Sequence, residues 1–314
     1  LRKRTERKER DTVKRILTLG ILSSFFFAFT FILNRSMNLS GGYWMWSASL
    51  RYLFSLPILL LLVGMQGKLK PVLAAIRQAP GPWLLWSTVG FGLFYAPLTW
   101  ASDFGPSWLT VSLWQLTIVA GVFLNPLWGK KVPLNSLGAV LVILAGVVLI
   151  QGESILSGQA GGEALVCVGL IAIAAVAYPL GNRKMMSLCG ETLDTPQRVL
   201  GMTICSLPFW LILSAVAAAQ GRLPDGNQLA QAFLVCLFSA VIATLLFFQA
   251  TNLAQSDPRL LSVAEGTIAG EIIFTLIGGV VLLHDPLPSG VQMLGIAVII
   301  AGMLLNCRAA AGRS

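Results

Sequence analysis

Residues 260–283 read LLSVAEGTIAGEIIFTLIGGVVLL, an apolar segment that nevertheless contains two carboxylates, Glu265 and Glu271. An α-helix needs roughly 20 apolar residues to cross a ~30 Å hydrocarbon core, and this segment is long enough. Comparable segments recur along the chain, giving ten expected crossings, or nine if two neighbours merge. The other nine lie at 16–34, 43–64, 83–100, 108–128, 136–151, 164–180, 199–219, 229–253 and 291–305.

The composition agrees with this pattern. Hydrophobic residues make up 56% of the 314 positions and charged residues only 11%, which is too little charge to cover a soluble domain of this size. The loops between the apolar segments are short and leave no room for a soluble domain. The sequence therefore predicts an all-α polytopic membrane protein.

The positive charge collects in alternate loops and predicts the orientation of the chain. Basic residues concentrate on the cytoplasmic side of membrane proteins, so the net charge of +9 indicates topology rather than a nucleic-acid partner. We expect a basic cytoplasmic arm at 1–15, a periplasmic linker at 152–163 and a cytoplasmic tail at 308–314, in a bacterial inner membrane. The other expected inside loops carry Lys68, Lys70, Arg77, Lys130, Lys131, Arg183, Lys184 and Arg259.

The chain repeats itself once, as 16–151 and 164–307. Arg51 is followed by Ser55-Leu56-Pro57, and Arg198 is followed by Ser206-Leu207-Pro208. Five crossings per copy would invert the second copy, an arrangement that many transporters use to alternate access to a site at the repeat interface. The alternative is an old duplication kept only for packing.

Small residues in the fifth and tenth segments predict tight helix packing. They allow backbones to approach closely where lipid supplies no hydrophobic drive. We expect either an intramolecular contact or a dimer seam, so the protein could be a monomer or a homodimer. The residues are Gly138, Ala139, Ala145, Gly146, Gly295, Ala297, Ala301 and Gly302.

The two halves resemble the ten-helix drug/metabolite transporter superfamily, in its EamA-like, multidrug-resistance efflux branch. The resemblance rests on Leu50-Arg51-Tyr52-Leu53-Phe54, on Leu282-Leu283-His284-Asp285-Pro286-Leu287 and on the Gly-rich ends of the fifth and tenth segments. It covers about 16–305. It implies a 5+5 inverted-repeat carrier with both termini inside, which moves small organic solutes. The chain has His284-Asp285 where the family usually shows Gly-Glu.

Three charges fall within expected crossings. Charged side chains inside a membrane are expensive and mark function or a structural ion pair. At ~1.5 Å per residue, Glu265 lies about 9 Å and Glu271 about 18 Å from the inner edge, and Arg51 also lies ~18 Å from it. Glu271 and Arg51 are therefore expected near the midplane. Glu271 could bind a proton or a cationic solute with Arg51 tuning it, or the two could form a static bridge.

Other residues complete the candidate site. Gln115 is the counterpart of Glu265 in the first half, and Trp114, Tyr95 and Tyr178 lie deep enough to offer aromatic faces to a cation, although such residues also serve packing. Asp103 is expected to cap the helix that follows Pro106. The cysteines lack CxxC spacing and no phosphate-binding loop occurs, so we expect no metal, no cofactor and no enzymatic activity.

We therefore expect a secondary active transporter that exports small organic solutes, such as drug-like cations, amino acids or related metabolites. Its partners would be that solute, protons and the lipid bilayer. The alternative is a non-transporting membrane scaffold or a lipid-handling protein.

Overall fold

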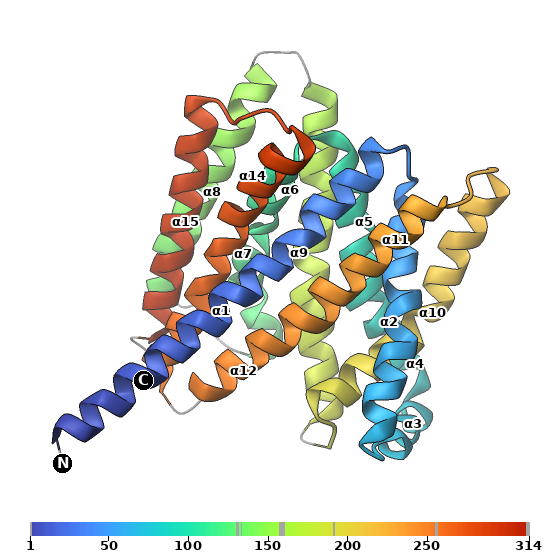
Figure 1. Cartoon of the computed structure of the whole chain (residues 1–314), viewed down its shortest axis with the longest axis horizontal. Helices are drawn as coiled ribbons and strands as arrows, with labels where there is room; N and C mark the ends of the chain where they lie inside the picture. Colours follow the sequence, from blue (N-terminus) through green and yellow to red (C-terminus); the bar gives the residue numbers. More distant parts are fainter. Residues whose placement is uncertain are drawn as a thin grey trace. The chain divides into compact units, whose positions relative to one another are not determined.

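The computed structural model describes residues 2–129, 132, 134–156, 161–190, 192–254 and 257–311, and its elements are all helices (Figure 1). The first half contains α1 (Arg2–Leu39), α2 (Trp44–Met65), α3 (Leu69–Gln78), α4 (Pro80–Ser87), η1 (Thr88–Gly92), α5 (Leu93–Ala101), η2 (Ser102–Phe104), α6 (Ser107–Trp114), α7 (Leu116–Phe123), η3 (Asn125–Trp128) and α8 (Leu134–Leu156). The second half contains α9 (Gly161–Cys189), α10 (Thr195–Ala219), α11 (Gly226–Val235), η4 (Cys236–Ala243), α12 (Thr244–Ala254), α13 (Pro258–Gly266), η5 (Thr267–Ala269), α14 (Gly270–Leu283) and α15 (Gly290–Ala311).

Seven helical spans among the described residues are long and apolar enough to cross a membrane, and two shorter apolar helices occupy 107–123 and 136–152. Each expected segment falls on helix, but 83–100, 108–128, 229–253 and 260–283 are each divided into shorter helical pieces. The count of ten crossings therefore stays a prediction. Lys130 and Lys131 lie outside the described residues, as does part of the expected linker at 152–163.

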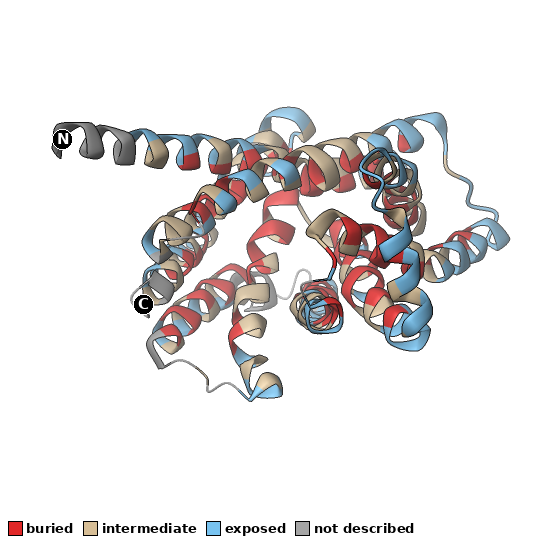
Figure 2. Ribbon diagram, turned by 90° about the horizontal axis from the view of Figure 1, so that it is seen from below, coloured by how far each residue is buried: buried red, intermediate tan, exposed pale blue. Residues whose placement is uncertain are grey.

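The helices carry exposed apolar faces, which suit a hydrocarbon solvent. Figure 2 shows buried and exposed positions alternating along individual helices. Leu61, Val148 and Ile212 are each about two-thirds exposed, although each lies in the middle of an apolar helix. Such positions would face lipid rather than water.

The chain divides into two compact units. Unit 1 comprises Leu1–Ile32, Pro106–Ala164 and Leu237–Ser314, and unit 2 comprises Leu33–Gly105 and Leu165–Cys236. Each unit therefore takes helices from both halves of the sequence. We describe the two units separately.

In unit 1, α8 and α15 pack along each other with their glycines in contact (Figure 1). A Cβ added to Gly146 would lie 2.7 Å from the Gly295 carbonyl oxygen, and one added to Gly295 would lie 2.8 Å from that of Gly146. A Cβ at Gly302 would lie 3.0 Å from the Ile143 nitrogen. The predicted tight packing is thus an intramolecular contact, and Gly138, which has nothing within 4 Å, does not contribute to it.

In unit 2, α2 and α10 pack together through aromatic side chains instead. The Tyr52 and Trp210 rings stack with centroids 4.5 Å apart. Trp210 is fully buried. Helices α2 and α10 therefore contact each other through stacked rings, where α8 and α15 use close backbone approach.

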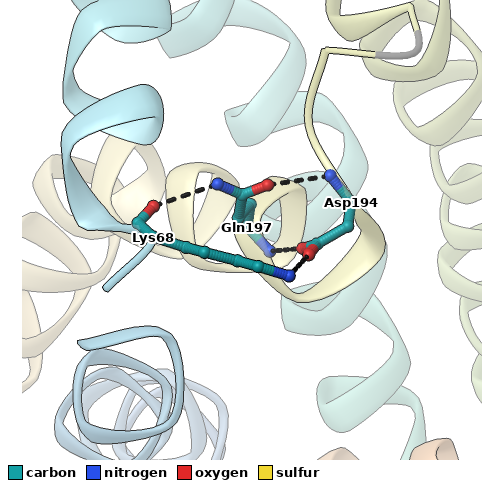
Figure 3. A network of polar contacts seen from close by, with 3 residues as sticks. All are labelled: Lys68, Asp194 and Gln197. Atoms are coloured by element: carbon teal, nitrogen blue, oxygen red, sulfur yellow. Dashed lines mark hydrogen bonds and ion pairs between the residues drawn. The ribbon is translucent and has the colours of Figure 1, made fainter. Parts of the chain in front are cut away.

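A polar network fastens the start of α10 to the turn before α3 (Figure 3). Asp194 caps α10 by accepting from the Gln197 backbone N–H at 3.0 Å, and the Gln197 side chain accepts from the Asp194 N–H at 2.9 Å. Gln197 Nε2 donates to the Lys68 carbonyl at 3.0 Å, and Lys68 Nζ lies 2.6 Å from Asp194 Oδ2. The capping box thus satisfies the backbone groups at a helix start.

Candidate functional site

Glu271 is the acid that unit 1 buries. It lies in the first turn of α14 and is 6% exposed. Among the residues that the structure describes, no hydrogen bond or ion pair reaches its carboxylate from within unit 1. A carboxylate in an apolar helix is costly, and one without a partner is a candidate functional group.

The helix that carries Glu271 is interrupted immediately before it. The 3₁₀ turn η5 separates α13 from α14, so that Glu265 and Glu271 lie on different helical pieces. The corresponding apolar segment of the first half is interrupted as well, between α6 and α7 at Gln115. Interrupted helices free backbone groups and are where transporters place binding sites.

Gln115 and Glu271 lie at the same level of unit 1. Helix α6 begins where α14 ends, since Asp285 beyond α14 accepts from the Ser107 N–H at 2.8 Å and a Cβ at Gly279 would collide with the Ser107 hydroxyl. Eight residues along each of these antiparallel helices bring Gln115 level with Glu271. Gln115 is 2% exposed, and its side-chain Nε2 donates to the backbone carbonyl of Val111, four residues earlier, at 3.1 Å.

Hydroxyls of α1 donate to the π and 3₁₀ turns that interrupt the helices of unit 1. Ser24 Oγ donates to the Thr267 carbonyl of η5 at 2.5 Å, and Ser23 Oγ donates to the Ala243 carbonyl at the end of the π turn η4, at 2.9 Å. Thr30 donates to the Ser239 hydroxyl of η4 at 2.6 Å. These residues were missed at the sequence level, where paired serines in an apolar helix were the available signal.

Two further hydroxyls lie on α6 and α14 of unit 1. The Oγ1 atoms of Thr110 and Thr275 are buried and have no hydrogen-bond partner among the described residues. Thr275 follows Glu271 by four residues, which places both on one face of α14. Glu265 differs, because its side chain is exposed, and Trp114 is half-buried.

Unit 2 contains the predicted Arg51, Tyr95 and Tyr178. The Arg51 guanidinium carbon lies 4.1 Å from the centroid of the Tyr95 ring and 5.9 Å from that of Tyr52. Tyr95 is fully buried, and its hydroxyl is within hydrogen-bond distance of the Asn34 side chain, at 3.2 Å from Nδ2. The ring face therefore stabilises the cation by a cation–π interaction.

Tyr178 joins this aromatic cluster from its edge. Its ring centroid lies 4.8 Å from that of Phe94, and Phe94 in turn lies 5.7 Å from Tyr95. Tyr178 is 40% exposed. The structure thus brings Arg51, Tyr95 and Tyr178 together in unit 2, and in unit 1 it places Gln115 level with Glu271. The predicted pairing of Arg51 with Glu271 joins different units and stays a prediction.

The expectation that Asp103 caps the helix after Pro106 is wrong. Asp103 lies in η2 and accepts from Asn38 Nδ2 at 2.8 Å, while Asp285 caps Ser107 through both its N–H and its hydroxyl. Burial raises the pKa of Asp103 to about 6, although the Asn38 hydrogen bond and the Arg35 charge oppose this rise. An acid from a distant loop took the role because α14 ends beside the start of α6.

Comparisons with known proteins agree with these observations. A family model described as "Putative multidrug resistance efflux transporter" (EmrE) matches residues 14–311. The chain is 48% identical to the "Uncharacterized protein YjlA" of Bacillus subtilis (strain 168) over 303 residues, which cover 92% of this chain and 93% of the relative. It is also 45% identical over 272 residues to an "Uncharacterized 42.1 kDa protein in intracellular alkaline protease 3'region" of Shouchella clausii, covering 83% and 71% of the two chains.

One crystal structure shares the fold. Its TM-score is 0.61 at 14% sequence identity, and the match covers 95% of this chain and 99% of that one. At that identity the likeness shows fold alone. The family match extends over nearly the whole chain and coincides with the long apolar helices. The chain therefore belongs to the EmrE family of multidrug resistance efflux transporters and is a multi-pass membrane protein.

Proposed function

We propose that this protein is a secondary active exporter of small organic cations or zwitterions, driven by proton exchange at Glu271. Drug-like cations, amino acids and related metabolites belong to this class. The observation that carries the proposal is a buried carboxylate without a partner in unit 1, beside helices that are interrupted in both halves of the chain. Such an acid can hold a proton in one state and a cation in the other.

Several irregular features support two inverted five-helix repeats. The π turns begin at Thr88 and Cys236, α2 contains Pro57 and α10 contains Pro208, and the interruptions begin at Gln115 and Thr267. Each second feature lies 148 to 152 residues after its counterpart. Irregularities that recur at constant spacing are difficult to attribute to packing alone.

The packing of equivalent helices agrees with a repeat. Helix α2 packs on its counterpart α10 within unit 2, and α8 packs on its counterpart α15 within unit 1. A two-fold relation between the halves brings counterpart helices together at its axis. In this proposal both termini lie in the cytoplasm, as the alternating basic loops predict, and the halves rock to expose the Glu271 level to each side in turn.

The charges suggest which solutes are accepted. The Glu271 carboxylate would attract a cationic group, and the Gln115 amide and the Thr110 and Thr275 hydroxyls could orient polar groups of the solute. In unit 2, the Arg51 guanidinium would bind the carboxylate of a zwitterion.

Proteoliposomes with an imposed pH gradient test the proposal. We would follow ethidium, a fluorescent cation, together with an amino-acid panel, and report lumenal pH with trapped pyranine. Glu271→Gln keeps the shape of the side chain but cannot exchange a proton, so we expect flux at the level of protein-free vesicles. Arg51→Gln should slow transport of zwitterions more than transport of ethidium.

Glu163→Gln is the matched control, because Glu163 is an exposed acid in the first turn of α9. It should transport as the wild type does. Coupled flux that survives Glu271→Gln would contradict the role of this acid. A wild type without flux for every solute would instead favour a membrane scaffold.

A further inference from the structure

Unit 1 contains a groove of about 530 Å³ between α1, α13 and α15. Leu17 and Ile21 of α1, Val263 and Gly266 of α13, and Leu304 of α15 line it. Leu17, Ile21 and Leu304 are all more than one-third exposed, so the groove is open at the surface of the unit. It is separate from Glu271 and Gln115, which do not line it.

The positive charge of the groove lies at one end. Arg259, at the start of α13, and Arg308, near the end of α15, both line it and both have exposed side chains. The two helices run in opposite directions, because Ser262 Oγ donates to the Cys307 carbonyl at 2.8 Å, and this brings both arginines to the same end. Within the described part of the chain, no carboxylate forms an ion pair with either guanidinium.

The remaining walls offer nothing to a water-soluble ligand. The hydroxyl of Ser262 is already donated to Cys307, and that of Thr267 is donated to the Ala264 carbonyl at 2.6 Å. The other lining side chains between Arg259 and Gly270 are apolar. An inorganic anion or a polar metabolite would therefore gain contacts only at the two arginines.

The length of the groove matches one leaflet of a bilayer. From Arg259 to Gly270 the helix rises about 16 Å, and half of a ~30 Å hydrocarbon core is ~15 Å. An acyl chain that begins at the level of the arginines would end near the bilayer centre. Lys14 and Arg15, which precede Ile16 where α1 packs on Ala264, add exposed positive charge at the same end.

We propose that this groove binds one anionic phospholipid of the bilayer, with its phosphate between Arg259 and Arg308 and an acyl chain along the apolar walls. A guanidinium pair favours a phosphate oxygen geometrically as well as by charge. An anionic headgroup carries a net negative charge that attracts these cations, whereas a zwitterionic headgroup has no net charge. The site is independent of the transport proposal, and its test measures lipid binding rather than flux.

Native mass spectrometry of the full chain in detergent tests the site. Dioleoylphosphatidylglycerol and dioleoylphosphatidylcholine are titrated separately, and bound lipid is counted. We expect half-saturation by the anionic lipid at about tenfold lower concentration, the effect expected of two cations on an anionic headgroup. The double variant Arg259→Gln/Arg308→Gln should lose this preference, and Arg259→Lys/Arg308→Lys should keep part of it.

The matched control is Lys70→Gln/Arg77→Gln, which removes the same charge from exposed positions of α3 in unit 2. It should keep the tenfold preference. Ile21→Trp places a larger side chain in the apolar part of the groove, where the acyl chain would lie, and should lower the occupancy of both lipids equally. The proposal is overturned if the control loses as much preference as the groove variant, if the groove variant retains it, or if millimolar inorganic phosphate displaces the lipid.

Discussion

The two units each carry a charge in an apolar helix, but they surround it differently. In unit 2 the Arg51 guanidinium lies 4.1 Å from the face of the fully buried Tyr95 ring. In unit 1 the nearby hydroxyls of Ser23 and Ser24 are donated to backbone carbonyls, and no described group of that unit pairs with Glu271. The comparison separates a charge that is held in place from one that is available for exchange.

The same contrast extends to the helix seams. Unit 2 joins α2 and α10 by the stacked Tyr52 and Trp210 rings, while unit 1 joins α8 and α15 by glycine contacts. Aromatic stacking holds the ring of Tyr52, the residue that follows Arg51 in the sequence. Glycine contacts instead leave no side chain between the helices. The predictions below test each side of this comparison.

The largest effect is expected in the aromatic cluster of unit 2. Trp210→Ala would remove a fully buried ring that stacks on Tyr52, and we expect a loss of about 3–5 kcal/mol of unfolding free energy. Denaturant unfolding in detergent, followed by circular dichroism, measures it. Leu211→Ala, at a neighbouring exposed position, should change stability by less than about 0.5 kcal/mol. Equal losses would show that the stack does not hold this region.

The glycine seam of unit 1 should respond next. Gly295→Val places a side chain where a Cβ already lies 2.8 Å from the Gly146 carbonyl oxygen, and we expect about 1–3 kcal/mol of destabilisation from overpacking. The same unfolding assay measures it. Gly138→Val, on the open side of α8, should be tolerated. If both variants unfold alike, helix propensity rather than contact explains the glycines.

A smaller loss of unfolding free energy is expected where Ser24 of α1 bonds to η5. Ser24→Ala removes the hydroxyl bond to the Thr267 carbonyl, which then keeps only the Gly270 N–H as a donor, and should cost about 1 kcal/mol. Hydrogen exchange of the amides in 264–272 should rise in parallel. Thr18→Ala removes a comparable but exposed bond on the same helix and serves as the control. Unchanged exchange would mean that η5 does not depend on α1.

The smallest effect is a pH dependence at the end of unit 2. Because burial raises the Asp103 pKa to about 6, the folded protein holds this proton more tightly than the unfolded chain does. The resulting stability is complete below about pH 4, the ordinary range of an aspartate, and is lost as pH rises through about 6. Thermal midpoints of the wild type and Asp103→Asn should therefore diverge between these values.

Asp194 should change the stability with pH in the opposite direction. Burial acts to raise its pKa, but the Lys68 hydrogen bond, the Gln197 N–H and the Lys68 charge together lower it. Its contribution is present above the ordinary pKa of an aspartate and is lost as pH falls below it. Asp194→Asn should therefore leave the slope between pH 4 and 6 intact. A wild-type slope that survives Asp103→Asn would assign the titration to another group.

Much of the fold followed from one-dimensional patterns. Apolar length placed the helices, and small residues identified the α8–α15 seam, because both depend on local composition. The hydroxyl bonds from Ser23 and Ser24 depend on where the π and 3₁₀ turns place their carbonyls, and no local pattern reports this. The capping of α6 by Asp285 likewise needed the distant end of α14 to be placed beside Ser107.

The candidate site was predicted unevenly for the same reason. Glu271 and Arg51 stood out because charge in an apolar helix is anomalous wherever it occurs. Tyr95 proved to face Arg51, whereas Glu265, which shares the anomaly of Glu271, is exposed. Depth along a helix can be counted from sequence, but the direction in which a side chain points depends on neighbours that are remote in the chain.

The π turns at Thr88–Gly92 and Cys236–Ala243 have a mechanical consequence. Each contains one residue more than the α turn that it replaces. Moving that surplus residue by one position rotates a single side chain by about 100° while both helix ends stay where they are. Each half of the chain thus contains a π turn at which one side chain can change direction without unwinding of its helix.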